Sequence, residues 1–429
     1  MLNQFLNSIA DVGRDLWQRR AGNGRRSRDA LRALCDDLLS TRGEASGIAV
    51  AREVAQTYDT LDEGARLALF RILNDAFAPD AGAINAAAQA YRDGGDLETF
   101  LALARSVEPP RQEFFRRLNM APGGTRTIVS MRAHLLGLLR EHPELKAVDA
   151  DLRHLLGSWF NRGFLTLERI DWHTPADILE RLIQYEAVHR MDGWDDLRRR
   201  LDRDRRCFAF FHPALPDEPL IFVEVALVNG LATSIQPLLD RSGEPDDPAR
   251  ADTAIFYSIS NCQDGLAGIS FGNFLIKQVV HELARELPNL KVFSTLSPIP
   301  GLRRWLAEQA DLTEVEREAV GRLEIADWQR NEALALAVRP VLMRLCARYL
   351  VEAKRGDRPA DPVTRFHIGN GARLEQINWM GDSSANGIAQ SAGMLCNYLY
   401  DLKTIERNHE AYANSGKVAV SSQVRKLLG

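Results

Sequence analysis

The spacing of hydrophobic residues changes character partway along the chain. Over residues 1–172, apolar side chains recur three and four positions apart, as they do at Leu67, Phe70, Leu73 and Phe77. This spacing places the side chains on one face of an amphipathic helix. Similar apolar faces recur along this stretch, so we expect helix to follow helix up to residue 172.

Short apolar runs, rich in β-branched and aromatic residues, replace the helical spacing after residue 206. Such runs are typical of buried strands. They occupy residues 207–211, 220–227, 254–261 and 290–296. A glycine-rich turn at 263–272 follows the third run, and helical spacing returns over 276–283 before the fourth. The order is therefore strand, glycine loop, helix and strand.

The last third of the chain is predicted to mix helices with extended structure. Helices are expected over 302–310 and over 341–353, the second of them starting after Pro340 because proline is tolerated in the first helical turn. Residues 366–380 are expected to be extended. A helix with a face of small residues is predicted over 387–400.

The glycine-rich turn has the composition of an anion-binding loop. Gly265, Gly268 and Gly272 allow backbone N–H groups to approach a ligand, and the following helix start offers unpaired amides. The alternative is an ordinary strand-to-helix turn that uses glycine for close packing. The turn has neither the Walker A lysine-serine pair nor Gly-x-Gly-x-x-Gly, which disfavours a triphosphate or NAD site.

Composition narrows the class of protein. At roughly 150 residues per domain, 429 residues predict two or three domains, and 45% hydrophobic residues suffice for packed cores. A net charge of −4 gives no indication of nucleic-acid binding, and no apolar run reaches the about 18 residues that span a bilayer. We therefore expect neither a nucleic-acid nor a membrane partner.

The cysteines and histidines do not indicate a metal site. Five scattered cysteines without a Cys-x-x-Cys pair predict free thiols in a reducing compartment. The histidines also lack the spacing of metal ligands. The first twenty residues carry Asp11, Arg14 and Asp15 among their apolar positions, unlike a secretory signal. We expect a cytoplasmic protein without a bound metal.

Five blocks of sequence, in order along the chain, are similar to the malonyl-CoA decarboxylase family. They lie at 256–260, 265–277, 296–301, 366–372 and 378–380. The resemblance is strongest between residues 172 and 400. It implies an α+β fold in which a helical domain, 1–172, serves oligomerisation or support. A catalytic domain, 173–429, would then have a GNAT-type, acetyltransferase-like mixed sheet flanked by helices.

The resemblance also implies the substrate and its binding residues. The substrate would be malonyl-CoA and the product acetyl-CoA, with no separate cofactor because CoA is part of the substrate. The family's acyl-CoA loop corresponds to Ala267, Gly268, Ile269, Ser270, Phe271, Gly272 and Asn273. A homo-oligomer, dimer or tetramer, is implied as well. The chain ends in Leu427-Leu428-Gly429 rather than in the peroxisomal Ser-Lys-Leu signal of some family members.

Carried over by motif, the family's catalytic serine and histidine fall on Ser297 and His367. Without the resemblance, a serine before proline would be interpreted as a turn cap. A single histidine would be interpreted as a packed or surface residue. Loss of CO2 leaves negative charge on the α-carbon, and the thioester carbonyl accepts this charge as an enolate. One hydrogen-bond donor and one acid therefore suffice for catalysis. We expect Ser297 to orient the malonyl carboxylate and His367, titrating near about 6.5, to protonate the α-carbon.

Three alternatives stay open from the sequence. A serine-histidine pair could form an acyl-enzyme, although no Gly-x-Ser-x-Gly elbow surrounds Ser297. The chain could be an acyl-CoA N-acyltransferase of the same fold, or a CoA-sensing scaffold without turnover. For the CoA 3′-phosphate, Lys277, Arg303 and Arg304 are candidate partners.

Overall fold

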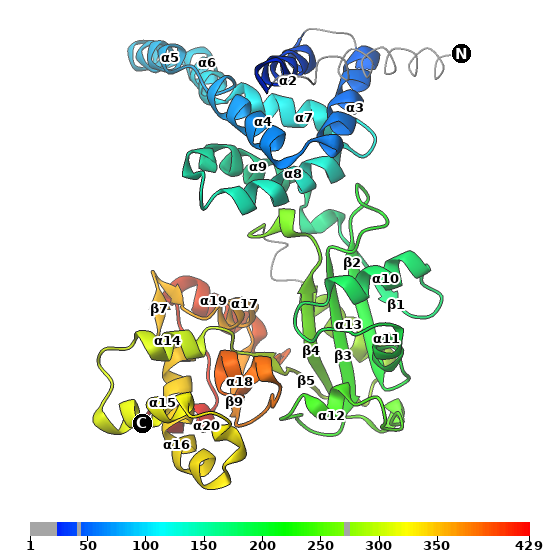
Figure 1. Ribbon diagram of the computed structural model, residues 1–429, viewed down its shortest axis with the longest axis vertical. Coiled ribbons are helices and arrows are strands. Elements are labelled where there is room, and N and C mark those ends of the chain that lie inside the picture. Colours follow the sequence, from blue (N-terminus) through cyan, green and yellow to red (C-terminus); the bar gives the residue numbers. More distant parts are fainter. Residues whose placement is uncertain (1–23, 41–43, 270–274) are drawn as a thin grey trace. The chain divides into compact units, whose positions relative to one another are not determined.

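The computed structural model describes residues 24–40, 44–269 and 275–429, which form two compact units (Figure 1). Unit 1 comprises residues 1–165, 212–218 and 263–270, and unit 2 comprises the remaining segments. The first part of the glycine loop therefore belongs to unit 1. Within the described residues, no helix is long and apolar enough to cross a membrane.

Most helices of unit 1 bury one apolar face, whereas no residue of α5 or α6 is buried. In α4, for example, Leu69, Phe70, Ile72 and Leu73 are buried, while the carboxylate of Asp62 caps the first turn by accepting from the amide of Ala65. The α-helices are α2 (Gly24–Leu39), α3 (Glu44–Thr60), α4 (Glu63–Asp75), α5 (Ala81–Gly94), α6 (Leu97–Val107), α7 (Pro110–Asn119), α8 (Gly124–Leu138) and α9 (Lys146–Trp159). Short 3₁₀ turns include η1 (Pro143–Leu145), η2 (Arg162–Phe164) and η4 (Asp264–Leu266).

The prediction of helix up to residue 172 is wrong over its last residues. Strand β1 (Thr166–Ile170) pairs antiparallel with β2, with Arg169 opposite Phe208. Its sequence, Thr-Leu-Glu-Arg-Ile, does not alternate between polar and apolar residues. Pairing with a strand some forty residues further along the chain makes it a strand.

Unit 2 is built on a mixed sheet with the order β1-β2-β3-β4-β5-β10-β6, and β9 also pairs with β10. Among the strand pairs of the described residues, only β4 and β5 run parallel. A parallel pair needs a crossover connection, which α13 (Leu275–Glu286) provides. The strands are β2 (Arg205–Phe211), β3 (Ile221–Val228), β4 (Thr253–Asn261), β5 (Val292–Thr295), β6 (Ser297–Pro298), β9 (Arg373–Asn378) and β10 (Leu395–Leu399). The expected strand, helix and strand are confirmed, and residues 270–272 of the predicted glycine loop lie outside the described residues.

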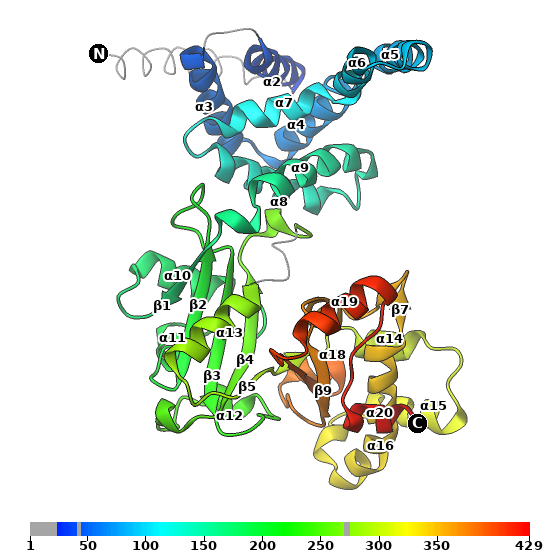
Figure 2. The same cartoon turned by 180° about the vertical axis from the view of Figure 1, so that it is seen from behind.

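Helices cover both faces of this sheet. Apolar side chains of α10 and α11, such as Leu179 and Leu197, form a buried core with Ala209 and Phe222 of the sheet. Figures 1 and 2 place α13 on the opposite face. The helices of unit 2 are α10 (Ala176–Tyr185), α11 (Trp194–Arg200), α12 (Gln236–Leu239), α13, α14 (Leu302–Glu308), α15 (Glu314–Gly321), α16 (Glu332–Val351), α17 (Pro362–Gly369), α18 (Ala385–Ser391), α19 (Ile405–Ser415) and α20 (Ser422–Leu428). A hairpin of β7 (Lys354–Arg355) and β8 (Arg358–Pro359) lies apart from this sheet. The expected mixed sheet flanked by helices, following a helical region, is confirmed.

Three predicted elements in the last third of the chain need correction. Residues 366–369 belong to helix α17, not to an extended segment. Residues 387–400 divide between α18 and the buried strand β10. Helix α16 does not begin after Pro340 but runs through it, and the carbonyl that this proline leaves unpaired belongs to Leu336, an exposed residue.

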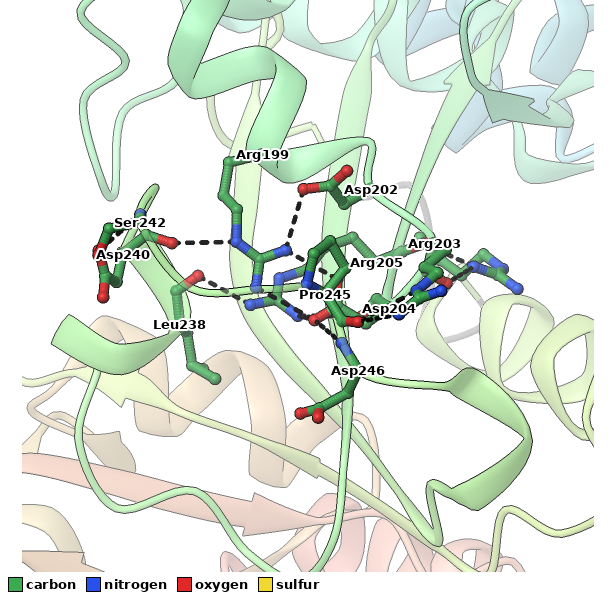
Figure 3. Close-up of polar contacts among 11 residues, drawn as sticks. Arg199, Asp202, Arg203, Asp204, Arg205, Leu238, Asp240, Ser242, Pro245 and Asp246 are labelled. Carbon is green, nitrogen blue, oxygen red and sulfur yellow. Dashed lines mark hydrogen bonds and ion pairs between the residues drawn. The ribbon is translucent and has the colours of Figure 1, made fainter.

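A buried ionic cluster ties the start of β2 to the connection before β4 (Figure 3). The Asp204 carboxylate accepts from Arg199 at 2.7 and 3.1 Å and forms an ion pair with Arg205 at 2.8 Å. It also accepts from the amide of Asp246, and Arg199 donates to the carbonyl of Asp240. Burial by itself favours the neutral acid, yet the two guanidinium groups hold the pKa of Asp204 below its usual range.

We expect Asp204→Asn to lower the free energy of unfolding by about 3 kcal/mol at pH 7, because it leaves two buried arginines without their carboxylate. The folded-state pKa of Asp204 is below its unfolded value. Its contribution is therefore present above about pH 4 and is lost as the pH falls further. Chemical denaturation of both proteins at several pH values measures this difference.

Asp246→Asn is the matched control, because its exposed side chain lies in the same connection and only its backbone amide joins the cluster. A difference between Asp204→Asn and wild type that stayed constant from pH 7 to pH 3 would contradict the assignment of Asp204 as an ionised carboxylate.

Candidate active site

A cavity of about 250 Å³ opens in unit 2 beside the parallel strand pair. It is lined by Val188, Ile221, Val223, Phe256, Tyr257, Ile259, Asn261, Leu275, Ile276, Leu296, Ser297, Pro298, Pro362, Val363, Phe366 and His367. Most of these side chains are apolar, and a few polar groups converge among them. Ligand sites commonly have this composition. The two catalytic residues predicted by resemblance, Ser297 and His367, both line this cavity.

Ser297 is the first residue of β6 and follows β5 by two positions. Its backbone is fixed by pairing with Cys396 of β10, and its side chain is almost fully buried. The Ser297 hydroxyl donates to Oγ1 of Thr295 at 2.8 Å and lies 3.2 Å from Nε2 of His367. The sheet therefore holds this hydroxyl in one orientation toward the cavity.

His367 is positioned by a capped helix and two tyrosines. The Asp361 carboxylate caps α17 by accepting from the amide of Thr364 at 2.8 Å, so the helix begins at Pro362, five residues before the histidine. The imidazole stacks on the ring of Tyr398, with centroids 4.6 Å apart, and its Nδ1 lies 2.7 Å from the hydroxyl of Tyr400. Both tyrosines belong to the segment around β10.

The hydrogen bonds of Tyr400 decide which imidazole nitrogen carries the hydrogen. Burial raises the pKa of Tyr400 well above its ordinary value, so the phenol stays protonated. Within the described part of the chain, Nδ1 of His367 is the only partner of this hydroxyl. We therefore assign the hydrogen of the neutral ring to Nε2, which donates toward Ser297.

This direction of donation has a chemical consequence for Ser297. An imidazole that donates to a serine does not act as a base toward it, so Ser297 is not activated as a nucleophile. The hydrogen bonds instead run from Tyr400 through His367 and Ser297 to Thr295. Such an arrangement suits a hydrogen-bond donor at Nε2 rather than acyl-enzyme formation.

The expectation that His367 titrates near its ordinary value is wrong. Complete burial lowers the pKa of His367 to about 3, because the apolar surroundings disfavour the charged ring. No carboxylate contributes to this shift. The free protein consequently holds His367 neutral at physiological pH.

Sequence reasoning missed Tyr400, Tyr398 and Thr295. The tyrosines fell within a predicted helix, although Cys396, Tyr398 and Tyr400 alternate with other residues in the pattern of a strand. That period-two pattern was the available signal. The sequence held no such signal for Thr295, because its role depends on its contact with the side chain of Ser297, two residues further along the chain.

The structure separates the roles of the loop glycines. A β-carbon on Gly265 would lie 1.9 Å from the carbonyl oxygen of Val129, so this glycine allows close packing on α8. Gly268 has φ of 73°, a left-handed conformation that favours glycine. Of the predicted CoA-binding residues, Ala267, Gly268 and Ile269 are described. Ser270, Phe271, Gly272 and Asn273 lie outside the described residues.

Two of the three candidate partners of the CoA 3′-phosphate already have carboxylate partners. Lys277 lies 2.6 Å from Glu406, and Arg303 lies 2.6 Å from Glu324. Arg304 is exposed. Among the described residues, no group of three histidine, cysteine, aspartate or glutamate side chains could hold a metal ion.

Two family models match the chain. Residues 163–429 match the model described as malonyl-CoA decarboxylase C-terminal domain, and residues 77–160 match the malonyl-CoA decarboxylase N-terminal domain. The mitochondrial malonyl-CoA decarboxylase of Anser anser anser is 36% identical over 415 residues, covering 88% of this chain and 82% of that protein. The mitochondrial enzyme of Rattus norvegicus is 34% identical, covering 92% and 85%.

Solved structures agree with these matches. The crystal structure of malonyl-CoA decarboxylase from Rhodopseudomonas palustris has a TM-score of 0.90 and 51% identity, covering 93% of this chain and 99% of that one. The malonyl-CoA decarboxylase from Agrobacterium vitis gives a TM-score of 0.88 and 50% identity, with the same coverage of each chain.

We expect the His367 ring to stay neutral, with its hydrogen on Nε2, from pH 8 down to pH 5 in the free protein. Nitrogen-15 NMR of labelled histidine measures both properties, and the signal is assigned by its loss in His367→Gln. Because the folded pKa of about 3 lies below the unfolded value near 6.5, the unfolded chain binds the proton first. His367 should therefore reduce stability as the pH falls below about 6.5. A midpoint near 6.5 in the ligand-free protein would contradict this assignment.

Proposed function

This chain belongs to the malonyl-CoA decarboxylase family, and on that basis we propose that it converts malonyl-CoA to acetyl-CoA and CO2. The observation that supports this most directly is the buried Tyr400–His367–Ser297 series of hydrogen bonds inside a largely apolar cavity. Apolar surroundings favour loss of a charged carboxylate as neutral CO2, since they offer the carboxylate little solvation.

We assign the first step to the hydroxyl of Ser297 and Nε2 of His367. When the substrate binds, the Ser297 hydroxyl turns its single hydrogen from Oγ1 of Thr295 to the malonyl carboxylate. It thereby orients the carboxylate, with the C–C bond that breaks perpendicular to the thioester plane. The negative carboxylate raises the pKa of the imidazole beside it, because an opposite charge favours the charged ring. Substrate binding is therefore accompanied by uptake of one proton at His367.

In the second step the C–C bond breaks and CO2 leaves. The electron pair moves onto the α-carbon and is delocalised to the thioester oxygen as an enolate. His367 then donates its proton to the α-carbon, which gives acetyl-CoA and returns the ring to its neutral form. A hydrogen-bond donor at the enolate contributes roughly 10²–10³ in rate and a positioned acid roughly 10²–10⁴.

We further propose that the reaction needs neither a metal ion nor an organic cofactor. The thioester carbonyl is itself the electron sink, so hydrogen bonds can support the enolate. An acyl-CoA N-acyltransferase, the alternative on the same fold, requires an amine acceptor. A decarboxylase turns over malonyl-CoA alone, so an assay without acceptor separates the two functions.

The helical unit offers a surface for self-association. None of the residues of α5 and α6, all of which the structure describes, is buried, and the two helices expose Leu97, Phe100, Leu101 and Val107. Exposed apolar side chains that cluster in this way mark protein interfaces. We propose that α5 and α6 mediate assembly of a homo-oligomer.

We also propose the cytoplasm as the location of the protein. All five cysteines are within the described residues, and each is a buried free thiol. A chain with only reduced cysteines suits a reducing compartment.

Malonyl-CoA incubated with the protein, without acceptor and after exhaustive chelation, should release CO2. In deuterated water, the acetyl methyl group should gain deuterium because His367 exchanges with solvent. The pKa governing kcat should exceed that governing kcat/KM, since the bound carboxylate raises the pKa of His367. An intact thioester in this assay would contradict decarboxylation, and activity that required an added metal would contradict the proposed chemistry.

The two side chains are tested by variants in the same assay. His367→Asn keeps a hydrogen-bonding group but cannot act as an acid, so we expect kcat to fall by roughly 10² or more with KM little changed. Ser297→Ala should also lower kcat, and the double variant should be little worse than the poorer single one. His173→Asn, at a histidine whose side chain is 97% exposed, is the control. Wild-type kcat in His367→Asn would remove this residue from the mechanism.

Self-association is tested by placing charges on α6. Leu97→Glu with Phe100→Glu should lower the mass measured by light scattering, because both side chains are exposed in the single chain and buried in the proposed contact. Val315→Glu, at a residue 64% exposed on α15, is the matched control and should leave the mass unchanged. A monomeric wild type would overturn the proposal.

A further inference from the structure

The described part of the glycine loop is anchored in unit 1 by one buried arginine. Arg132 of α8 donates to the carbonyl oxygens of Gly265 at 2.7 Å and Ala267 at 2.9 Å. Its guanidinium also bonds Asp149 of α9 at 2.8 Å. Arg132 therefore fixes the position of the loop while its charge is balanced by Asp149.

This anchoring sets the direction in which the loop offers its amides. In a trans peptide the C=O and the next N–H point in opposite directions, so the amide of Gly268 points away from Arg132. Within the described residues that amide has no hydrogen-bond partner. The left-handed turn at Gly268 thus presents an available N–H donor.

Arg153 of α9 lies next to the same turn. One guanidinium nitrogen of Arg153 is 4.0 Å from the position that a β-carbon on Gly268 would occupy. Unlike Lys277 and Arg303, this arginine has no ion pair with any described carboxylate, and it is exposed. A guanidinium beside an unpaired amide is an arrangement that binds phosphate oxygens.

The surrounding surface is hollowed and carries uncompensated positive charge. A cavity of about 590 Å³ is lined by Lys146, Asp149, Ala150, Arg153, His154, Gly157 and Ser158 of α9. Its one carboxylate, Asp149, is engaged by Arg132. Lys146 and Arg153 are therefore left to balance an incoming anion, on a chain whose net charge is −4.

We propose that Arg153, assisted by Lys146, binds the phosphate groups of the ADP portion of CoA. The inference rests on the proposed function, since it takes malonyl-CoA as the ligand, and it adds a binding role for the helical unit. The ADP portion carries a pyrophosphate and a 3′-phosphate, both of which suit a guanidinium with an adjacent backbone amide. Arg153 contributes to binding and takes no part in the bond-breaking steps.

The experiment compares Arg153→Gln with wild type on three substrates. These are malonyl-CoA, malonyl-3′-dephospho-CoA and malonyl-pantetheine, which has neither the pyrophosphate nor the 3′-phosphate. We expect KM for malonyl-CoA to rise about tenfold with kcat little changed, because a charge-assisted hydrogen bond is lost. For malonyl-pantetheine the two proteins should be equal.

The dephospho substrate identifies the phosphate. If the effect of Arg153→Gln disappears with malonyl-3′-dephospho-CoA, Arg153 binds the 3′-phosphate; if it persists, Arg153 binds the pyrophosphate. Arg153→Lys should restore part of the affinity, whereas Lys146→Gln should weaken malonyl-CoA binding to a smaller degree. Arg28→Gln, at an exposed arginine of α2, is the control.

The outcomes separate this inference from the proposed function. A wild type that decarboxylates malonyl-CoA, combined with unchanged KM in Arg153→Gln, overturns the inference alone. Equal losses on all three substrates also overturn it, because they would indicate a structural role. If wild type releases no CO2, the proposed function fails, and calorimetric titration of CoA into wild type and Arg153→Gln still tests the phosphate contact.

Discussion

The site depends on the burial of one imidazole. His367 lies in apolar surroundings that lower its pKa to about 3, and its ring nitrogens are satisfied by Tyr400 on one side and Ser297 on the other. A buried polar ring without partners would destabilise the fold, so the two hydroxyls both support the ring and fix its tautomer. In the mechanism that we propose, the proton that His367 transfers therefore has to be taken up when the substrate carboxylate binds. This mechanism would link substrate binding and proton transfer through one electrostatic interaction.

The supports of this imidazole come from segments far apart in the sequence. Ser297 is held at the junction of β5 and β6, whereas Tyr398 and Tyr400 come from β10 and the residue after it, and β10 pairs with both β5 and β6. Asn397 strengthens this junction by donating to the carbonyl of Thr295 at 2.6 Å. The sheet therefore does more than carry Ser297, one of the two proposed catalytic residues. It brings the hydroxyl groups on either side of the imidazole into register.

Arginine has three distinct tasks in this molecule, and its surroundings decide between them. Arg199 balances a buried carboxylate and thereby joins two segments of unit 2. The charge of Arg132 is balanced by the carboxylate of Asp149, and its other N–H groups orient the glycine loop. Arg153 has neither a carboxylate nor a carbonyl partner among the described residues, and so it is available for a ligand. The charge of the side chain does not distinguish these roles, because all three residues are arginines. The partners that surround each guanidinium group do.

The sequence by itself determined the local elements whose periodicity is strong and self-contained. The strand, glycine loop and helix around Gly265 follow from apolar spacing, and the motifs around Ser297 and His367 identified the family. Tertiary structure decided what long-range pairing controls. β1 and β10 became strands because each has partners distant in the chain, although their surroundings suggested helix. His367 lies on a capped helix, its pKa is set by burial, and Tyr400 and Arg153 gain their roles from neighbours brought close by folding. The local pattern of apolar residues reflects the preference of a segment for helix or strand. The burial of a side chain and its contacts with distant residues arise only when the chain folds.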